Sequence, residues 1–259
     1  MSEIAPSAAL QVQFASLGLD WIVPDWPVPS NVRAFSTSRN GEKGTSFDLS
    51  RRAEGNDARR RLRRWLPKDP LWLAQVHGAD VVDIDRIDAE SSPEAPPRAD
   101  AAVARGVGTV CAVLTADCLP VLLTDRRGSI VAAAHAGWRG IAAGVLEATL
   151  TAMGTNSQAI IAWLGPAIGP QAFEVGADVL EAHCAWDPGA ADCFVPRSRD
   201  RWLADLYALA RRRLQRAGVM AIYGGGRCTF SEHRSFFSYR RGGTDAAGRM
   251  ATLIWRDAP

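Results

Sequence analysis

A cysteine and a histidine on either side of a short polar turn could share a metal ion or a proton. Cys118 ends the stretch Thr-Ala-Asp-Cys at 115–118, which separates two apolar runs, and His135 follows the apolar run 130–134. A β-hairpin whose turn centres near Arg127 would pair Cys118 with His135. Directly opposed residues in such a pair lie about 4.5–5.5 Å apart at Cβ. We therefore expect the thiol and the imidazole to face each other.

A third candidate, His77, follows the predicted strand 71–76 and opens the short turn 78–80. Two histidines and one cysteine form a three-ligand zinc set, which leaves a fourth coordination position open, as catalytic zinc sites require. Zinc would hold the cysteine as a thiolate and would lower the pKa of a bound water toward about 7. The alternative is that each of these side chains is a structural residue at the end of a strand.

Arg139 lies in the segment His-Ala-Gly-Trp-Arg-Gly at 135–140, just before a predicted helix. The two glycines of this segment permit close approach of the backbone. A helix N-terminus beside a guanidinium favours an anion such as phosphate. The alternative is a glycine turn in which Arg139 makes a structural ion pair.

Arg240 and Arg241 follow the aromatic run Phe-Phe-Ser-Tyr at 236–239. The rings could stack on a flat base, and the guanidinium groups could pair with phosphate. A strand with a buried face and a charged rim is the alternative.

The arginine-rich segment 51–64 is interpreted as the solvated face of a helix that leads into Trp65. A site for an anionic partner is the alternative.

Short β-like runs alternate with a few helices along the chain, and several runs are joined by turns too short for a parallel connection. We therefore predict one α+β domain in which mixed sheets are flanked by helices. The predicted helices cover 141–153, 178–184 and the apolar positions spaced from Leu203 to Leu214. The predicted strands are 32–36, 71–76, 81–84, 110–115, 121–124, 130–134, 160–164, 220–223 and 251–255.

Composition restricts the class of protein. The chain has 259 residues, and its 30 basic and 28 acidic residues nearly balance, which suits a globular chain and does not favour a nucleic-acid partner. The N-terminus lacks the pattern of a signal peptide, and no apolar run approaches the roughly 20 residues that span a bilayer. Five cysteines without a CxxC spacing do not indicate a disulfide framework. We expect a cytoplasmic protein with no membrane partner.

Several groups of residues, taken in order, resemble the motifs of the YfiH-like family. This family was first labelled multicopper polyphenol oxidase, or laccase, and was later described as zinc-dependent purine nucleoside phosphorylases with adenosine deaminase activity. The resemblance covers most of the chain, from about Val32 to Trp255. The groups are 75–78 (QVHG), 115–120 (TADCLP), 135–140 (HAGWRG), 165–169 with 173–176 (GPAIG, FEVG), 228–229 (CT), and 236–241 through 248–250 (FFSYRR, GRM).

The resemblance implies that His77, Cys118 and His135 are zinc ligands and catalytic residues, with one zinc per chain and copper as a less favoured metal. It also implies a single compact domain of stacked mixed β-sheets flanked by helices, in an α/β/β/α arrangement. This catalytic domain would cover residues 31–259, after an N-terminal extension at 1–30. Two places depart from the family pattern: residues 41–50 differ from its usual glycine-rich turn and acidic stretch, and Gly242 replaces an acidic residue.

The implied function is phosphorolysis of purine nucleosides such as adenosine, inosine, guanosine and methylthioadenosine, with adenosine deamination at the same site. Asp117, next to Cys118, could carry a proton during deamination. The expected partners are a small nucleoside and phosphate, and the protein is expected to be a monomer or a weak homo-oligomer. The candidate contacts for nucleoside and phosphate are Gln75, Arg139, Arg240 and Arg241.

Three other functions stay open. Cys118 could be the nucleophile of a metal-free hydrolase, with His135 as its base, that acts on an amide such as a cell-wall precursor. The domain could instead be a non-catalytic scaffold with structural zinc. A laccase needs about ten histidines for a blue-copper centre and a trinuclear cluster, and the chain has four. Phenol oxidation is therefore at most a side reaction.

Overall fold

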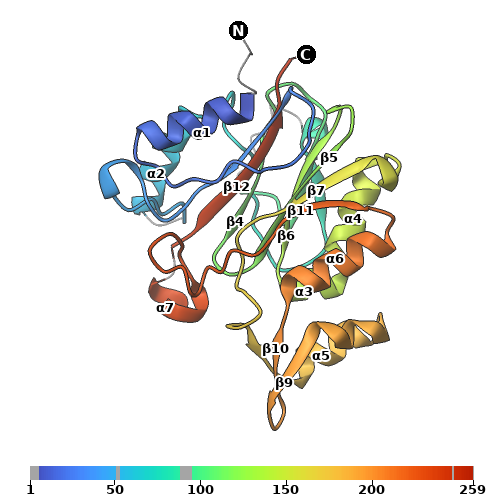
Figure 1. The fold of residues 1–259 in the computed structure, drawn as a ribbon. Helices are drawn as coiled ribbons and strands as arrows, with labels where there is room; N and C mark the ends of the chain where they lie inside the picture. The colour runs from blue at the N-terminus through green and yellow to red at the C-terminus, as the bar shows by residue number, and fades with distance from the viewer. Residues whose placement is uncertain (1–5, 51–52, 88–94, 247, 259) are drawn as a thin grey trace.

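Two β-sheets pack face to face in the computed structural model, which describes residues 6–50, 53–87, 95–246 and 248–258. Helices cover the outer face of each sheet, so the layers follow the order helix, sheet, sheet, helix (Figure 1). Apolar side chains fill the space between the sheets, with Val113 and Ile254 contributed by one sheet and Leu122 and Ala133 by the other. The predicted α+β fold with an α/β/β/α arrangement is confirmed.

The smaller of these two sheets joins the first and last strands of the chain. Its order is β1, β12, β4, and both pairs are antiparallel. The central strand β12 has the alternation that a strand between two buried layers needs, because Leu253 packs toward the outer helices and Ile254 toward the larger sheet. The strands are β1 (Val32–Ser36), β4 (Cys111–Thr115) and β12 (Met250–Arg256).

The larger sheet has six strands in the order β11, β7, β5, β6, β3, β2. The outer pairs β11–β7 and β2–β3 are parallel, and the other pairs are antiparallel. Every residue of β5 and β6 is buried, because one face of the sheet packs on the smaller sheet and the other on helices. The strands are β2 (Val81–Asp83), β3 (Ala101–Ala104), β5 (Leu119–Asp125), β6 (Val131–Ala136), β7 (Ile160–Leu164) and β11 (Ala221–Gly224).

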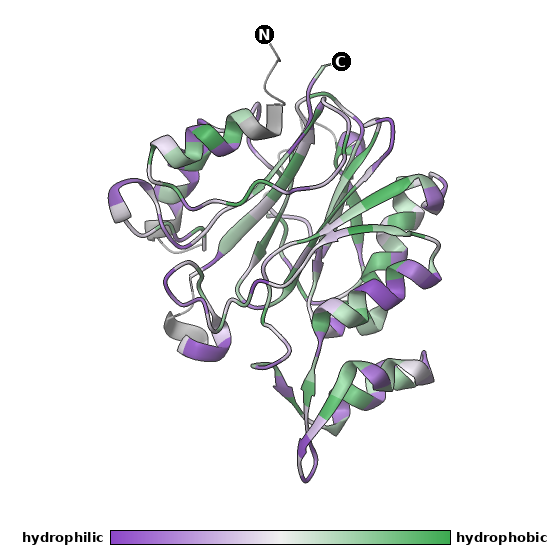
Figure 2. Cartoon of the chain, viewed as in Figure 1, coloured by the Kyte–Doolittle hydropathy of each residue, from purple (hydrophilic) through white to green (hydrophobic). Residues whose placement is uncertain are grey.

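Two groups of helices cover the outer faces of the sheets. Helices α1 and α2 pack on the smaller sheet through side chains such as Phe14 and Leu62, and α3, α4 and α6 pack on the larger sheet through Ile141, Leu146 and Leu214. Figure 2 shows apolar strands at the centre and polar residues on the outer faces of the helices. The helices are α1 (Pro6–Ser16), α2 (Ala53–Arg63), α3 (Trp138–Ala143), α4 (Val145–Met153) and α6 (Leu206–Arg216).

A third, three-stranded sheet projects from the two main sheets together with α5 (Figure 1). Its order is β8, β10, β9, and it is antiparallel. These elements are β8 (Glu174–Val175), α5 (Ala177–Cys184), β9 (Phe194–Ser198) and β10 (Arg201–Ala204), and α7 (Tyr239–Ala246) precedes β12. Short 3-10 helices are η1 (Glu42–Gly44), η2 (Ile84–Arg86), η3 (Ser157–Ala159) and η4 (Pro188–Cys193).

The described part of the segment before β1 packs into the fold. Phe14 of α1 and Trp21 of the following loop are buried, and the Phe14 ring lies 5.1 Å from Trp21 and 5.3 Å from Phe35 of β1. Edge-to-face contacts between aromatic rings stabilise a core beyond the burial of their area. The domain boundary between residues 30 and 31 stays a prediction.

The prediction of a strand at 71–76 is wrong. The backbone N–H of Ala74 donates to the carbonyl of Pro97, which lies in a loop. The Gln75 side chain bonds the backbone N–H and C=O of Leu114 in β4, as a neighbouring strand would otherwise do. Because a loop and a side chain satisfy the polar groups here, the apolar pattern of this segment does not produce a strand.

The other predicted strands are present, with ends that differ by no more than two residues. The predicted helix 141–153 is divided into α3 and α4 at Gly144, which has φ 91°. Leu203 belongs to β10, and α6 begins only after Asp205, whose side chain accepts the N–H of Ala208 and so caps the helix. The predicted helix 178–184 corresponds to α5.

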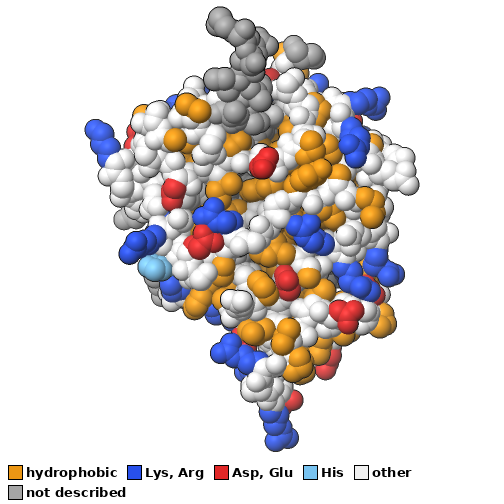
Figure 3. Space-filling model, in the orientation of Figure 1, with side chains coloured by type: hydrophobic (Ala, Val, Ile, Leu, Met, Phe, Trp, Pro, Cys, Tyr) orange, Lys and Arg blue, Asp and Glu red, His pale blue; other side chains and the backbone are white. Residues whose placement is uncertain are grey.

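The arginine-rich segment forms α2, apart from residues 51 and 52, which lie outside the described residues. Arg59 packs over the ring of Trp72 and Arg61 over the ring of Phe47. On the face shown in Figure 3, basic side chains are interspersed with acidic and apolar ones. Of the helices that the structure describes, none has the length and apolar character to cross a membrane.

Candidate metal-binding active site

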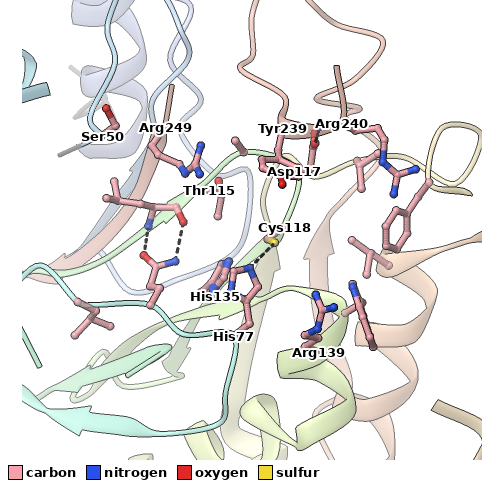
Figure 4. A pocket seen from close by; sticks show the side chains of 18 of the residues that line it. Ser50, His77, Thr115, Asp117, Cys118, His135, Arg139, Tyr239, Arg240 and Arg249 are labelled. Carbon is pink, nitrogen blue, oxygen red and sulfur yellow. Dashed lines mark hydrogen bonds between the residues drawn. The ribbon is translucent and has the colours of Figure 1, made fainter. Parts of the chain in front are cut away.

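His77, Cys118 and His135 lie together at the end of the β5–β6 hairpin (Figure 4). The Sγ atom of Cys118 lies 3.8 Å from Nε2 of His77, and one ligand atom from each of the three residues lies within 4.8 Å of the others. The two imidazole rings meet edge to face with centroids 4.8 Å apart. In the part of the chain that the structure describes, this is the one group of at least three such side chains with metal-binding spacing. The structure therefore brings together the three residues predicted from the sequence.

The predicted pairing of Cys118 with His135 is wrong by two residues. In the observed register Pro120 pairs with His135, and Cys118 lies just before β5 begins. A shift of two residues leaves every side chain on the same face of a sheet, so the thiol and the imidazole still converge. Gly137 leaves room for the thiol, because a Cβ at that position would lie 2.8 Å from Sγ.

His77 adopts a left-handed backbone conformation with φ 61°, which a non-glycine residue reaches at a cost of about 1–3 kcal/mol. The fully buried carboxylate of Asp100 stabilises this turn. Its Oδ1 accepts the N–H of His77 at 2.9 Å, and its Oδ2 accepts the N–H groups of Val76 and Gly78 at 3.1 and 2.7 Å. One buried carboxylate thus holds the loop that directs the exposed imidazole of His77 toward Cys118.

Asp100 also contacts His135, since its Oδ1 lies 2.8 Å from Nδ1 of that histidine. This hydrogen bond places a ring proton on Nδ1 and leaves Nε2 to act as a metal ligand. Metal-bound histidines usually have such a hydrogen bond from their other ring nitrogen. Burial raises the pKa of the Asp100 carboxyl, but the hydrogen bonds from His135 and from the 76–78 turn hold that pKa below its ordinary value. Asp100 therefore remains a carboxylate at neutral pH.

Cys118 and His135 shift each other's pKa. Burial raises the pKa of the Cys118 thiol, but the charge of His135 and hydrogen bonds from both histidines lower it to about 6. Burial lowers the pKa of His135, but the Cys118 charge and the Asp100 hydrogen bond raise it to about 9. At neutral pH the metal-free cluster therefore contains a thiolate beside an imidazolium. The thiolate is the form of cysteine that binds metals and attacks electrophiles.

The cluster opens onto a cavity of about 1010 Å³. His77 is exposed and Cys118 is half-buried, whereas His135 is 3% exposed. A small molecule in the cavity can therefore reach the cluster. Aromatic and positively charged side chains also line this cavity (Figure 4), among them Phe173, Tyr239, Arg139, Arg240 and Arg249.

Comparisons with known proteins agree with this geometry. The model of the family described as multi-copper polyphenol oxidoreductase laccase matches residues 40–257. The chain is 49% identical over 245 residues to the purine nucleoside phosphorylase YfiH of Escherichia coli. The aligned region covers 90% of this chain and 98% of the Escherichia coli protein. The chain belongs to the YfiH family.

Other members of the YfiH family support the same assignment. A purine nucleoside phosphorylase of Pseudomonas aeruginosa is 47% identical over 91% of this chain and 98% of its own length. The crystal structure of Neisseria meningitidis protein NMB0706 has a TM-score of 0.84 at 44% identity, covering 92% of this chain and 100% of that one. The crystal structure of YlmD from Geobacillus stearothermophilus has a TM-score of 0.78 at 28% identity, and the match covers 88% of this chain and 93% of YlmD.

The donor set of this YfiH-family site fits a metal ion. Tetrahedral zinc with bond lengths of about 2.0–2.3 Å places neighbouring ligand atoms about 3.3–3.8 Å apart, and Cys118 Sγ and His77 Nε2 are 3.8 Å apart. The hydrogen bond to Asp100 leaves Nε2 of His135 available as the third donor. With three protein ligands, the cluster can hold a metal ion that keeps one position open toward the cavity.

Two of the predicted arginines line the cavity of the YfiH-family site. Arg139 is exposed, with its guanidinium 4.3 Å from the ring of Trp138. Arg240 lies over the ring of Phe173 and donates to the carbonyl of Glu174 at 2.9 Å. Both guanidinium groups are therefore supported on a protein surface at the edge of the cavity.

Arg241 and Gln75 are held by backbone groups. Gln75 lines the cavity, but its side-chain amide forms hydrogen bonds of 2.8 and 2.7 Å with the backbone of Leu114. The guanidinium of Arg241, which is not part of the cavity lining, donates to the carbonyls of Thr229, Phe230 and Phe236. Arg241 thereby stabilises the loop before α7.

Asp117 lies beside Cys118 in a left-handed conformation with φ 88°. Its Oδ1 accepts a hydrogen bond from the hydroxyl of Thr229 at 2.6 Å. Its Oδ2 accepts bonds from the hydroxyl of Ser238 at 3.0 Å and from the backbone N–H of Arg240 at 2.7 Å. The carboxylate therefore links the segment before β5 to the start of α7.

Sequence reasoning missed Asp100 and Arg249. Asp100 interrupts an alanine-rich run at 99–104, and an isolated acidic residue in such a run is a signal for a buried carboxylate with specific partners. Arg249 lines the cavity together with Asp117, although more than a hundred residues separate them in the chain. No local pattern predicts that proximity.

The laccase part of the family description can be compared with the positions of the four histidines. His77 and His135 belong to the cluster, whereas His183 is buried beside the ring of Phe194 and His233 is exposed in the loop before α7. Among the described residues, the metal-binding geometry therefore provides for one metal position in this member of the YfiH family.

Proposed function

We propose that this chain is a zinc-dependent purine nucleoside phosphorylase. Relatives with that name are 49% and 47% identical to it over nine-tenths of its length. The observation that carries the proposal is that one cavity combines the His77, Cys118 and His135 cluster with arginine side chains. Phosphorolysis needs a nucleoside and an anionic nucleophile to be held side by side, and the arginine side chains of the same cavity can hold the anion.

Aromatic and aliphatic side chains suit the cavity to a purine nucleoside. Phe173 and Tyr239 line it, and aromatic rings of this kind stack on flat bases. Aliphatic side chains make part of the cavity lining apolar, and hydroxyl groups offer hydrogen-bond partners to a ribose. The aliphatic residues are Leu73, Leu114 and Ile168, and the hydroxyl residues are Ser50 and Thr115.

Arg139 and Arg240 are the proposed contacts for phosphate. Neither has a carboxylate partner in the described chain, so both charges are available to an anion. A guanidinium binds phosphate through paired N–H donors, which fix the orientation of the anion as well as its position. The two arginines would thereby align the phosphate oxygen for attack on the ribose.

The metal ligands are organised before any substrate binds. A bound zinc ion would supply a Lewis acid beside the substrate. Cys118 supplies the thiolate charge, His77 supplies Nε2, and Asp100 keeps the proton of His135 on Nδ1 so that Nε2 is a donor. The carboxylate of Asp100 therefore acts through the orientation of His135 and not through contact with the substrate.

We extend the proposal to hydrolytic deamination of adenosine at the same site. This reaction replaces the amino group of the purine with the oxygen of water and releases ammonia, so it needs an activated water in place of phosphate. The open side of the cluster faces the cavity in which the base would bind. The same ligands can therefore serve both reactions.

The phosphorylase proposal is tested with purified protein of known zinc content. Inosine and phosphate should yield hypoxanthine and ribose 1-phosphate, and omission of phosphate should abolish this product. Cys118→Ala should remove both zinc and activity. Cys184→Ala is the matched control, because Cys184 is half-buried outside the cluster. Full activity in Cys118→Ala would contradict the proposal.

Deamination is measured separately with adenosine and no phosphate, by following inosine and ammonia. The expected result is a zinc-dependent rate that Cys118→Ala and His77→Ala abolish. A deaminase rate that persists in both variants would show that a contaminating enzyme produces the inosine.

A second candidate function, a cysteine hydrolase acting on an amide, is favoured by one observation. Cys118, His135 and Asp100 form a chain of thiolate, imidazole and carboxylate, and such a chain can activate a nucleophile without metal. Chelation of zinc distinguishes the two candidates. A phosphorylase should lose activity with its zinc, whereas a hydrolase should keep it and tolerate His77→Ala.

A further inference from the structure

Buried serine and threonine side chains in the described chain have, with one exception, a hydroxyl that is hydrogen-bonded to the protein. The hydroxyls of Ser36 and Thr252 bond each other at 2.8 Å, and that of Thr124 donates to a backbone carbonyl at 2.9 Å. The exception is Thr115, which is 1% exposed and whose hydroxyl has no hydrogen-bond partner among the described residues. The other bonded residues of this group are Thr37, Ser38, Thr149, Thr229 and Ser238.

An unpartnered hydroxyl at position 115 does not benefit the fold. Thr115 is the last residue of β4, and the period of two along a strand places its side chain on the same face as Val113, between the two main sheets. A valine would have the same shape and an equal preference for a strand. It would also avoid the cost of a buried polar group without a partner. The hydroxyl therefore points to a partner that comes from outside the folded chain.

The cavity gives such a partner access to Thr115. This residue belongs to the cavity lining and lies between Arg249 and the cysteine and histidine cluster (Figure 4). Ser50 and Tyr239 also bring hydroxyls to the lining. That of Ser50 already donates to Oδ2 of Asp48 at 3.1 Å, and Tyr239 is 47% exposed, so water can reach it. Among the described lining residues, Thr115 combines a buried position with an unpartnered hydroxyl.

We propose that Thr115 is a specificity-determining residue whose hydroxyl binds a hydroxyl group of the ribose, so that the site favours nucleosides with a complete ribose over deoxy analogues. That the ligand is a nucleoside rests on the proposed function. A threonine hydroxyl both donates and accepts hydrogen bonds, as a sugar hydroxyl does. Phosphate is a poorer match, because its charge suits the guanidinium groups of Arg139 and Arg240. The flat face of the base suits aromatic rings such as Phe173.

Burial makes the hydroxyl of Thr115 selective. When a substrate lacks the hydroxyl that a site is built to bind, the buried group of the protein is left without a partner, and the site rejects that substrate. A hydroxyl in contact with solvent would instead exchange the substrate for water and discriminate little. Because Thr115 is almost fully buried, the loss of its partner should appear as a measurable loss of affinity.

Binding of inosine to zinc-loaded protein without phosphate, measured by calorimetry, tests the role of Thr115 apart from catalysis. Thr115→Val removes the hydroxyl but keeps the shape of the side chain, and it should raise the Kd for inosine about tenfold with zinc content unchanged. Thr115→Ser keeps the hydroxyl and should bind inosine nearly as the wild type does. An unchanged Kd in Thr115→Val would overturn the proposal.

Thr124→Val is the matched control for Thr115→Val. Thr124 is also a buried strand residue, but its hydroxyl is bonded to the carbonyl of Ile130 near the end of β5 that is remote from Cys118, and it is not part of the cavity lining. The same substitution at this position should leave the Kd for inosine unchanged. A rise equal to that in Thr115→Val would show that the effect is not specific to the cavity and would contradict the proposal.

Deoxy analogues identify the sugar hydroxyl that Thr115 binds. The Kd values of 2′-, 3′- and 5′-deoxyinosine are compared with that of inosine in the wild type and in Thr115→Val. One analogue should bind the wild type about tenfold more weakly than inosine does, whereas Thr115→Val should bind both about equally, because the hydrogen bond is missing in either case. The other two analogues are internal controls, whose affinities relative to inosine should be the same in both proteins. Coupling to none of the three sugar hydroxyls would refute the assignment.

The free base hypoxanthine distinguishes a contact with the ribose from a contact with the base. Its Kd should be the same for the wild type and Thr115→Val, and a loss equal to that for inosine would assign the hydroxyl to the base and contradict the proposal. If Thr115→Val does not load zinc, Thr115→Ser and Thr115→Ala are compared, since both lack the methyl group and they differ in the hydroxyl alone. Equal Kd values for inosine in that pair would also contradict the proposal.

The binding assay separates this proposal from the proposed function. If the wild type binds inosine in a Thr115-dependent manner but no nucleoside yields ribose 1-phosphate, the phosphorylase proposal fails and the role of Thr115 stands. If the wild type shows phosphorolysis and Thr115→Val keeps its affinity for inosine and its discrimination among the deoxy analogues, the role of Thr115 fails and the phosphorylase proposal stands.

Discussion

The carboxylate of Asp100 lies 2.8 Å from Nδ1 of His135, and the same oxygen accepts the backbone N–H of His77 at 2.9 Å. One buried group therefore orients the imidazole of one cluster histidine and the backbone of the other. The two histidines come from a turn and from a strand more than fifty residues apart in the chain. Their alignment depends on a residue that belongs to neither segment.

Asp100→Asn should weaken both metal binding and the fold. An amide keeps the size of the carboxylate but removes its charge and one acceptor, so a backbone N–H of the 76–78 turn or the proton of His135 loses its partner. We expect zinc affinity to fall about 10–100-fold and the free energy of unfolding to fall by about 3–5 kcal/mol. Chelator competition and urea unfolding measure the two effects. The exposed Asp80→Asn serves as control, and equal zinc affinity in both variants would refute the role of Asp100.

In metal-free protein, Cys118 should be alkylated by iodoacetamide with a pH midpoint near the pKa of about 6. Only the thiolate reacts, so the rate should be high at neutral pH and should fall as the pH drops through 6. His135→Ala removes the positive charge that lowers the pKa of the thiol, and should move the midpoint up toward the ordinary value of 9.0. Peptide mapping by mass spectrometry follows Cys118, with Cys184 as an internal control because burial raises the pKa of its thiol. Zinc should protect Cys118, and a midpoint that stays near 9 in the wild type would contradict the thiolate assignment.

Gly137→Ala should disrupt the cluster without breaking the fold. Gly137 has φ −66°, which alanine adopts freely. An added Cβ would nevertheless lie 2.8 Å from Sγ of Cys118 and 3.4 Å from Cδ2 of His77. We expect zinc affinity to fall about tenfold or more, with little change in Tm. Gly78→Ala is the control, since a Cβ there meets its neighbours at 3.6 Å. Normal zinc content in Gly137→Ala would show that the thiol can shift without loss of the site.

Phe14→Ala should destabilise the whole domain, because Phe14 is fully buried against Trp21, Phe35 and Trp65. Removal of a buried phenyl ring costs about 3–5 kcal/mol in the free energy of unfolding. Urea unfolding measures the loss, and Val12→Ala on the same helix is the control, since Val12 is 62% exposed. An unchanged unfolding curve for Phe14→Ala would show that residues 1–30 form an extension that folds independently of the sheets.

Local sequence was sufficient to predict an element of the fold wherever neighbouring residues in the chain stabilise that element. The β5–β6 hairpin, with Cys118 before it and His135 within it, follows from apolar runs, a short turn and the period of two along a strand. The layered fold follows from alternation along strands such as β12. Even an error of two residues in the predicted register kept Cys118 and His135 on one face, because side chains repeat every two residues.

Sequence was insufficient to predict an element where the hydrogen-bond partners of its backbone lie far along the chain. The segment 71–76 has the composition of a strand, but Gln75 bonds the edge of β4 and Ala74 bonds a loop. The alanine-rich β3 was missed, because alanine has low β-propensity and its pairing with β2 and β6 supplies the strand.

The amino-acid sequence by itself marked His77, Cys118 and His135 as candidate metal ligands, through their types, their spacing and the resemblance to the YfiH-like family. Only the tertiary structure decided what orients them and what surrounds them. The hydrogen bonds of Asp100 with His135 and of Asp117 with the backbone of Arg240 each join segments distant in the chain. Such bonds depend on distance and angle in the folded state, which the order of residues along the chain does not specify.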